Sequence, residues 1–184
     1  YAFRNCASIE SVTIPDSVTD IGNSAFYYCG NITRARVPQS AMTLGLSAVF
    51  PSSYQKLQYL CLGANVTDLL ANEFRQCKAL TEVEVAEGNQ SFYVSADDGC
   101  LYDISGKTLW FCPRDVTAMV IPNGVTAIGN YAFQWCTNIT SVTMPDTVES
   151  IGTYSFHGCS NVSGITIPSG VQKLSTTAFD GCDT

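Results

Sequence analysis

Apolar residues recur along this chain in short groups that share one spacing. In the segment 9–15, IESVTIP, they occupy the first, fourth and sixth positions. Successive side chains of an extended chain point to opposite faces, so the fourth and sixth positions face one side and the third and fifth the other. The pattern therefore predicts a short, half-buried strand that ends at Pro15.

The same group returns about every 23 residues as part of a longer repeating unit. Its clearest copy is the segment 121–145, IPNGVTAIGNYAFQWCTNITSVTMP, and the next segment replays it. A fixed short period is typical of a solenoid, in which each unit buries its apolar face only against its neighbours. We expect a parallel sheet of about seven short strands, within the segments 9–14, 32–37, 57–62, 80–85, 116–121, 139–144 and 162–167.

The other half of the unit predicts a turn-rich second face. In its first copy, Val18 and Ile21 are expected to point inward, and Gly22 to supply a turn with positive φ. The following piece, Ala25 to Cys29, is too short for a stable helix, so it predicts one helical or 3₁₀ turn with Phe26 filling the interior. The fold class is thus an α/β-type repeat solenoid, with short helical or 3₁₀ turns or short strands on its second face.

Two segments depart from the period. Between residues 39 and 53 the repeat signals are diluted, with Phe50 standing in for the interior phenylalanine, and the strand register over 39–56 stays open. Between Val85 and Ile121, 36 residues replace the usual 23. That stretch contains two β-rich runs around Gly106, which predict a hairpin. We expect a single solenoid over 1–184 with an inserted hairpin over 87–115, standing on the solenoid.

Composition narrows the possible partners. Charged residues make up only 14% of the chain, and the net charge is −7. Sequence-independent nucleic-acid binding needs clustered Lys and Arg, so the charge argues against it, and against an acidic membrane surface. No apolar run is long enough for a transmembrane helix, so no direct membrane insertion is expected of this segment.

The nine cysteines follow the repeat rather than a disulfide framework. Six of them stand three residues after the repeat phenylalanine, which predicts a column of small, inert, buried thiols. Cys61 falls on an outward strand position and is the candidate for a modifiable thiol. Cys100 and Cys112 flank the hairpin, and the sequence leaves open whether they pair. The six cysteines of the predicted column are Cys6, Cys29, Cys77, Cys136, Cys159 and Cys182.

Residues for catalysis are scarce. The one histidine, His157, lies at a variable position of the repeat and is interpreted as a surface residue, because nothing in the sequence supplies an oriented triad around it. Phosphate-binding, dinucleotide, zinc-protease and EF-hand motifs do not occur. We therefore expect no enzyme, no cofactor and no metal.

The outward strand positions mark one distinctive surface. Most of them carry small residues, as in Ser11 and Thr13 or Ser141 and Thr143. Three successive strands differ, because their outward positions carry arginine, tyrosine and glutamate. Arginine and tyrosine are favoured residues for binding other molecules. The predicted binding residues are Arg34, Arg36, Tyr59, Glu82 and Glu84. The alternative is that the arginines and glutamates form solvated charge pairs across Tyr59, each worth less than about 1 kcal/mol. Exposed aromatics at Tyr27, Tyr28 and Trp135 offer a rival surface, unless they pack on neighbouring coils.

The repeating unit IPxxVTxIGxxAFxxCxNITSVTIP resembles the BspA-like leucine-rich repeat, and the insert containing DGCLYD and GKTL is similar to a segment common in that family. The resemblance covers nearly the whole chain. At residues 39–53 the sequence departs from the family's repeat pattern. It implies a right-handed leucine-rich-repeat superhelix on a cell surface or in a secreted protein. It also implies adhesion to partners such as host matrix proteins or other cells, and no catalytic residues.

These observations lead to two hypotheses for function. The first is a non-enzymatic binding or adhesion module that recognises a protein or glycan through the sheet face or the inserted hairpin. The second is a structural spacer that holds another domain away from the cell envelope. The chain begins and stops within a repeat, so we expect it to be a segment of a longer protein. The oligomeric state stays open.

Overall fold

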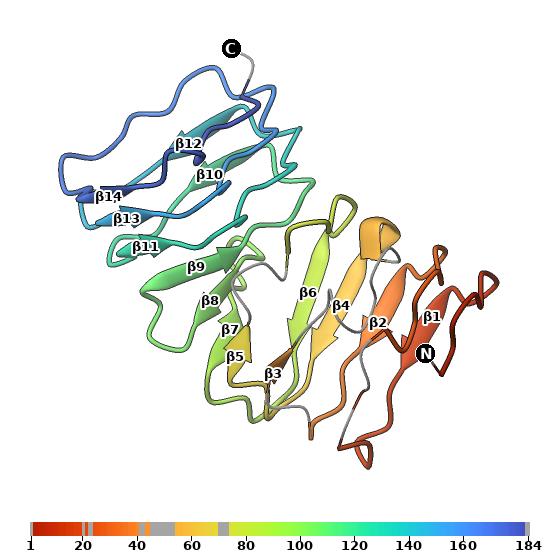
Figure 1. Cartoon of the computed structure of the whole chain (residues 1–184). Helices are drawn as coiled ribbons and strands as arrows, with labels where there is room; N and C mark the ends of the chain where they lie inside the picture. Colours follow the sequence, from red (N-terminus) through yellow and green to blue (C-terminus); the bar gives the residue numbers. More distant parts are fainter. Residues whose placement is uncertain are drawn as a thin grey trace. The chain divides into compact units, whose positions relative to one another are not determined.

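The computed structural model describes residues 2–19, 21, 24–40, 43–44, 54–69 and 74–182. The chain divides into two compact units, 1–93 and 94–184, and nearly all of its regular structure consists of short strands (Figure 1). Among the described residues, none of the helical structure is long and apolar enough to cross a membrane. The predicted repeat solenoid is confirmed in its strand-rich form, with turns linking the strands.

The first unit is built on a parallel sheet. Its strands are β1 (Ser11–Thr13), β2 (Arg34–Arg36), β4 (Tyr59–Leu62) and β6 (Glu82–Val85), in the order β1-β2-β4-β6. They lie side by side in Figure 1. The inward residues Ala35 of β2, Leu60 of β4 and Val83 of β6 are buried, while the residues on either side of each occupy outward positions. The alternation of inward and outward residues therefore predicted the positions of these four strands in the sequence.

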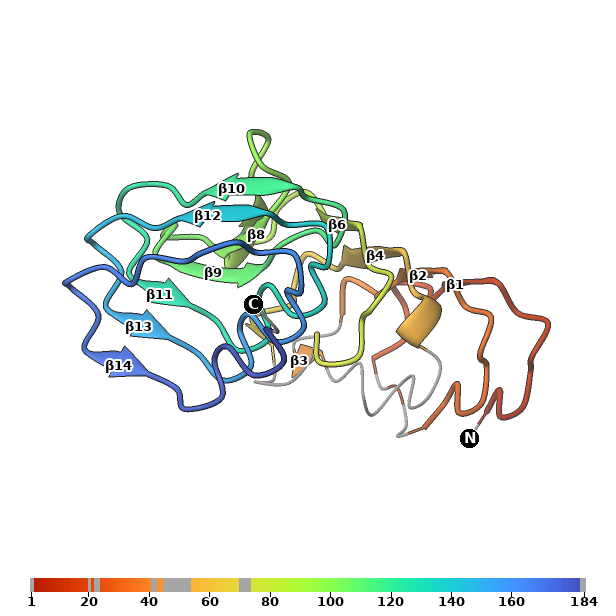
Figure 2. The same cartoon turned by 90° about the horizontal axis from the view of Figure 1, so that it is seen from above.

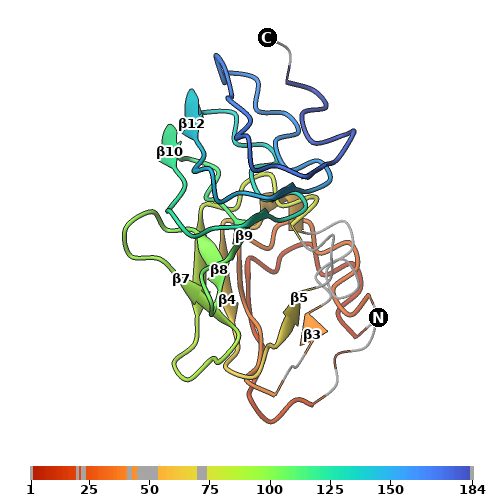
Figure 3. The same ribbon diagram turned by 90° about the vertical axis from the view of Figure 1, so that its left-hand side faces the viewer.

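The second face of this unit carries a shorter pair of strands. Here β3 (Thr43–Leu44) pairs in parallel with β5 (Asp68–Leu69), and Figure 3 shows this pair apart from β4. A 3₁₀ helix, η1 (Tyr54–Lys56), precedes β4. The β3–β5 pairing fixes the register at residues 43–44, which the sequence left open. The expected interior position of Phe50 lies outside the described residues.

The second unit has two layers of strands. In one layer β10 (Ala118–Val120) pairs in parallel with β12 (Ser141–Thr143), and a single bridge joins Val142 to Ile165. The seventh predicted strand is thus reduced to one bridge. The other layer belongs to a six-stranded sheet, most of whose strands are visible below β10 and β12 in Figure 2. Its order is β14 (Lys173–Leu174), β13 (Ser150–Ile151), β11 (Ala127–Ile128), β9 (Thr108–Phe111), β8 (Leu101–Asp103) and β7 (Phe92–Val94).

The predicted hairpin is formed by β8 and β9, which pair antiparallel. At its turn Gly106 has a φ of 68°, and Asp103 Oδ1 accepts a hydrogen bond from the amide of Lys107 at 2.9 Å. The other edge of β9 pairs in parallel with β11. The hairpin is therefore continuous with the sheet formed by the repeats.

Repeat residues form ladders from coil to coil. The rings of Phe133 and Phe156 stack at 4.8 Å between centroids, and those of Phe156 and Phe179 at 5.1 Å. Three of the column cysteines, Cys29, Cys159 and Cys182, add a polar ladder, because their thiols point at the carbonyl of the preceding coil's phenylalanine. Cys159 Sγ lies 3.1 Å from Phe133 O, and Cys182 Sγ lies 3.0 Å from Phe156 O. The repeat cysteine is thus a donor as well as a small core residue.

The repeat glycine has a different role from the one predicted. Gly22 lies outside the described residues, but its equivalents Gly129 and Gly152 do not adopt positive φ. A Cβ atom added at Gly152 would lie 2.7 Å from the amide nitrogen of Asn130. At these equivalents the prediction of a positive-φ turn is wrong. The glycine is needed because adjacent coils approach too closely for a side chain.

Candidate functional site

The five predicted binding residues lie together on the outward face of the first unit's sheet. Strand register aligns Arg34 with Tyr59 and Tyr59 with Glu82. It aligns Arg36 with Cys61 and Cys61 with Glu84. The arginines, the tyrosine and the glutamates therefore occupy two adjacent rows on three neighbouring strands. We call this surface the β2–β4–β6 patch, formed by Arg34, Arg36, Tyr59, Glu82 and Glu84.

Tyr59 is the centre of the patch. The guanidinium carbon of Arg34 lies 3.9 Å from the centroid of the Tyr59 ring, within the range of a cation–π interaction. The Tyr59 hydroxyl donates to Glu84 Oε2 at 2.5 Å. Partial burial and this hydrogen bond both raise the pKa of Tyr59, so the phenol stays protonated and remains a donor. Tyr59 thus links an arginine of β2 to a glutamate of β6.

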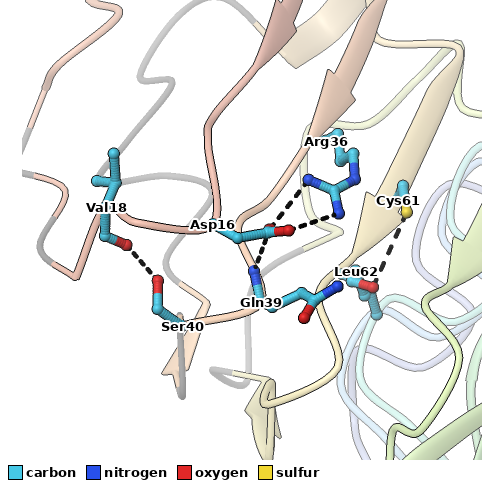
Figure 4. A network of polar contacts seen from close by, with 7 residues as sticks. All are labelled: Asp16, Val18, Arg36, Gln39, Ser40, Cys61 and Leu62. Atoms are coloured by element: carbon cyan, nitrogen blue, oxygen red, sulfur yellow. Dashed lines mark hydrogen bonds and ion pairs between the residues drawn. The ribbon is translucent and has the colours of Figure 1, made fainter.

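Arg36 is held by an acid from the preceding coil (Figure 4). Its Nη1 lies 3.1 Å from Asp16 Oδ1, and its Nη2 lies 3.3 Å from Asp16 Oδ2. The same carboxylate accepts the amide of Gln39 at 2.9 Å. The hydrogen bond from Arg36 lowers the pKa of Asp16, and Asp16 in turn raises the pKa of Arg36. The two-point contact fixes the direction of the guanidinium.

Asp16 was not predicted as part of this site. It occupies the position directly after the strand-ending proline, where Asp146 stands in a later repeat. An aspartate that recurs directly after a proline is typical of a turn. The available signal was its place one coil before Arg36, since the coil period brings residues about 20 positions apart into contact. Arg36 forms its ion pair with this acid, and Arg34 and Glu84 both contact Tyr59.

Cys61 corrects one prediction. Its position in the strand is outward, as expected, but only 7% of the residue is exposed, and its thiol lies 3.9 Å from the Leu62 carbonyl. Burial is the main cause that raises the pKa of this thiol. Reactive cysteines need an accessible thiolate. The prediction of Cys61 as a modifiable thiol is therefore wrong, because the residue is buried although its strand position is outward.

The rival aromatic surface is largely packed. Tyr27 contacts Tyr28 at 4.1 Å between centroids, and Arg4 lies over the Tyr27 ring. In the second unit, Trp135 meets His157 edge to face at 4.8 Å. Of the three predicted aromatics, Tyr28 alone is classed as exposed, at 52%. Packing on neighbouring coils explains the other two.

His157 is less exposed than predicted. Its side chain is 23% exposed and touches Tyr154 as well as Trp135. Its Nδ1 lies 3.7 Å from Asp180 Oδ2, beyond hydrogen-bonding distance. The imidazole is therefore a packing residue of the coil-to-coil interface. Within the described part of the chain, Nδ1 of His157 has no hydrogen-bond partner, so it activates no serine hydroxyl or cysteine thiol.

A hollow lies on the second unit, beside the start of β10. It encloses about 670 Å³ and is lined by carboxylates and by the outward face of the strand. The carboxylates belong to Asp97, Asp98 and Asp115. Val120 contributes an apolar wall that is 73% exposed. Within the described ranges, no group of three His, Cys, Asp or Glu residues is arranged to hold a metal ion.

Comparison with solved structures supports the fold. A leucine-rich cell surface protein from Faecalibacterium prausnitzii is 24% identical with a TM-score of 0.69, over 98% of this chain and 53% of that one. The pneumococcal vaccine antigen PcpA is 20% identical with a TM-score of 0.70, over 94% of this chain and 48% of that one. A leucine-rich repeat protein from Eubacterium ventriosum is 15% identical with a TM-score of 0.56, over 97% and 78% of the two chains.

The chain thus spans about half the length of the first two of these proteins. A comparison with functionally curated proteins gives no significant match. The family model described as the BspA type leucine rich repeat region, in six copies, matches residues 1–108 and 103–184. Together these matches cover the whole sequence, and the ladders of phenylalanine, cysteine and glycine described above are its repeating elements. The chain belongs to the BspA-type leucine-rich repeat family.

Proposed function

We propose that this chain is a non-enzymatic binding or adhesion module of a cell-surface or secreted protein. Its ligand is a protein or a glycan, and its main contact surface is the β2–β4–β6 patch. The observation that carries the proposal is the arrangement around Tyr59, where an exposed arginine covers an aromatic ring that is tied to a glutamate. Elsewhere in the repeat these outward positions carry small residues such as Ser141 and Thr143.

The chemistry of the patch suits a ligand of mixed polarity. Arg34 and Tyr59 together offer a flat cationic and aromatic surface, on which a sugar ring or a protein side chain can stack. Glu82 is exposed beside them and accepts hydrogen bonds from hydroxyl or cationic groups. Because Arg36 is already held by Asp16, its direction is set before any ligand arrives. A preorganised surface loses less conformational entropy on binding.

Family membership supports the same class of function. The two solved proteins with TM-scores near 0.7 are described as a leucine-rich cell surface protein and as a vaccine antigen. A surface location would bring the patch into contact with partners such as host matrix proteins or other cells. The net charge of −7 disfavours nucleic acid as the ligand.

Absence of enzymatic activity is part of the proposal. His157 is packed between aromatic rings, and the Tyr59 hydroxyl is kept protonated by its surroundings. General acid–base chemistry needs a group whose pKa lies near the working pH and that can reach a substrate. Neither residue meets both conditions. A reproducible hydrolase activity of the purified chain, lost on His157→Ala, would contradict this part.

The alternative is a structural spacer that carries another domain. A spacer needs the repeat ladders but not the distinctive patch, so the two functions separate experimentally. Binding of the wild-type chain is measured against immobilised matrix proteins, whole cells and a glycan array. The adhesion proposal expects saturable binding to at least one of these. A spacer would bind none of them.

The patch is then tested on the ligand found in that screen. The double variant Arg34→Glu with Glu82→Lys leaves the net charge unchanged and reverses both ends of the patch. We expect its Kd to rise at least tenfold, because Arg34 loses its contact with Tyr59 and both charges oppose their ligand groups. The matched control, Lys173→Glu with Glu149→Lys, makes the same exchange at exposed positions of the second unit and should bind like wild type. Equal affinity of all three proteins would exclude the patch.

A further inference from the structure

The cysteines on either side of the hairpin face each other across its open end. The pairing of β8 with β9 places Leu101 opposite Phe111. On the other side of the cysteines, a Cβ atom built on Gly99 lies 3.4 Å from Cγ of Pro113. Residues 100 and 112 stand between these two neighbouring pairs. Cys100 and Cys112 are therefore directly opposite each other on adjacent strands.

The backbone at this position suits a cross-strand bond. The amide of Cys100 donates to Asp98 Oδ1 at 2.8 Å, and its carbonyl accepts from Ser95 at 3.0 Å. The amide of Cys112 donates to Ala132 O at 2.9 Å. These bonds lead away from the facing cysteine, so the two residues form a non-hydrogen-bonded pair, in which Cα atoms lie roughly 4.5 Å apart. Disulfides span Cα separations of about 4.4 to 6.8 Å.

The side chains also meet. Both residues are 0% exposed, and interaction with the Cys100 side chain is the main cause that raises the pKa of the Cys112 thiol. Each of the two thiols also contacts a carbonyl, since Cys100 Sγ lies 3.7 Å from Asp98 O and Cys112 Sγ lies 3.7 Å from Pro113 O. Cys136, about one repeat further along the chain, is the second cysteine that reaches Cys112. Its sulfur lies 3.6 Å from Pro113 O and 3.6 Å from Nη1 of the buried Arg114. Of the two possible partners, Cys100 is the one on the facing strand.

We propose that Cys100 and Cys112 form a structural disulfide that closes the hairpin when the chain folds in an oxidising compartment. The oxidant is a low-molecular-weight disulfide or a thiol oxidoreductase in its disulfide form. One cysteine thiolate attacks the oxidant's disulfide, forming a mixed disulfide and releasing one thiol. The second cysteine thiolate then attacks the protein sulfur of the mixed disulfide and releases the oxidant's other thiol. The protein loses two electrons and two protons, and the oxidant gains them.

Burial determines when this reaction takes place. In the folded chain neither thiol is accessible, and the contact with Cys100 raises the pKa of Cys112, which disfavours the attacking thiolate. Oxidation therefore precedes the packing of the hairpin against the rest of the sheet. Once formed, the bond is shielded from reductants in the native protein. Its occurrence in the cell rests on the surface location proposed above, whereas its formation during refolding does not.

Tryptic cleavage offers a direct test. The denatured and reduced full chain is refolded with oxidised and reduced glutathione, then alkylated under denaturing conditions without reductant and digested. Cleavage after Lys78, Lys107 and Arg114 separates Cys100 on peptide 79–107 from Cys112 on peptide 108–114. We expect these two peptides to be joined. Alkylation of all nine cysteines would contradict the proposal. So would a link from 108–114 to peptide 115–173, which carries Cys136 and Cys159.

Two variants complete the test. Cys100→Ala should leave peptide 108–114 unlinked, with its thiol alkylated. Cys159→Ala removes another buried thiol of the same unit and should keep the link. The disulfide closes a loop of about 13 residues, so Cys159→Ala refolded in excess reductant should melt roughly 6 to 12 °C below the same variant refolded with glutathione. The melting temperature of Cys100→Ala should not respond. An equal response of the two variants would refute the assigned pair.

Discussion

Single residues of the patch are positioned by partners one coil away along the chain. Arg36 gives the clearest case, because its guanidinium direction is set by Asp16 and not by a neighbour on its own strand. Tyr59 is oriented in the same manner, with Glu84 of the following strand accepting its hydroxyl. The patch is therefore built on contacts across coils, because Arg34, Arg36, Tyr59 and Glu84 contact side chains 20 or 25 positions away in the sequence.

The contact between Arg36 and Asp16 predicts a titration. The hydrogen bond lowers the pKa of Asp16 below its ordinary value of 3.8. A group with a lowered folded-state pKa stabilises the protein above its unfolded pKa, and this contribution is lost as the pH falls through the folded value. Carboxyl-carbon NMR should therefore place the Asp16 midpoint below 3.8 in the wild type.

The matched variants for this titration differ only in which cation is removed. In Arg36→Gln the Asp16 midpoint should move upward towards 3.8, because the strongest cause of the shift is gone. In Lys173→Gln, which removes a cation of the second unit, it should stay where it is. An Asp16 midpoint that is the same in the wild type and in Arg36→Gln would show that the pair does not persist in solution.

Some residues were beyond prediction because their partners are distant in sequence. Asn89 is buried, and its amide donates to Gly63 O at 2.9 Å and to Val66 O at 3.0 Å, while its oxygen accepts two backbone amides. In the sequence it stands in a polar run that suggests a solvated loop. Arg114 likewise reads as a surface cation but is 4% exposed. The spacing of apolar residues predicts which apolar side chains are buried, but it does not predict buried polar residues such as Asn89 and Arg114.

At the scale of elements, the repeat pattern predicted most of what the structure contains. Six of the seven expected strands form, and the hairpin forms where two β-rich runs surround Gly106. The sequence did not indicate that β9 would pair with β11. That pairing depends on backbone hydrogen bonds, which leave no trace in side-chain polarity. The seventh strand is reduced to a bridge at Ile165, next to an open glycine position at Gly164.

The close contact of coils at the repeat glycine makes a prediction at this scale. In Gly152→Ala the new Cβ would meet backbone atoms of Asn130 and Gly129 at 2.7 and 2.8 Å. Backbone cannot give way as a flexible side chain can, so the free energy of unfolding should fall by about 1 to 3 kcal/mol. Urea denaturation of the full chain measures this.

Gly164→Ala is the control for that substitution. No atom lies within 4 Å of a Cβ built at Gly164, and its φ is not in the left-handed region. We expect the free energy of unfolding to stay within about 0.5 kcal/mol of wild type. If the two alanine variants were equally stable, close coil approach would not explain the repeat glycine.

At the scale of the whole molecule, the repeats and the site are carried by different residues. The repeat ladders of phenylalanine, cysteine and glycine fill the interior where the repeat is regular, as for Phe133 with Phe156 and Cys159 with Phe133. The five patch residues take no part in those ladders and replace small outward residues on three neighbouring strands. The sequence could therefore predict the location of the patch, as a departure from the repeat. It could not predict the internal contacts of Tyr59, which depend on side-chain direction.

This separation predicts that the site can be removed without disturbing the fold. A five-residue variant gives all three strands of the patch the outward serine and threonine found in β12, at Ser141 and Thr143. Its substitutions are Arg34→Ser, Arg36→Thr, Tyr59→Ser, Glu82→Ser and Glu84→Thr. Its control replaces outward residues of β10 in the same manner, with Ala118→Ser and Val120→Thr. Both proteins should keep the wild-type circular dichroism spectrum, because outward positions do not fill the core.

The decisive measurement is the affinity of these two proteins for the ligand identified with the wild-type chain. Our account predicts that the five-residue variant binds at least tenfold more weakly than wild type, while the β10 control binds with unchanged Kd. Wild-type affinity in a folded five-residue variant would contradict the central claim that the β2–β4–β6 patch is the binding surface.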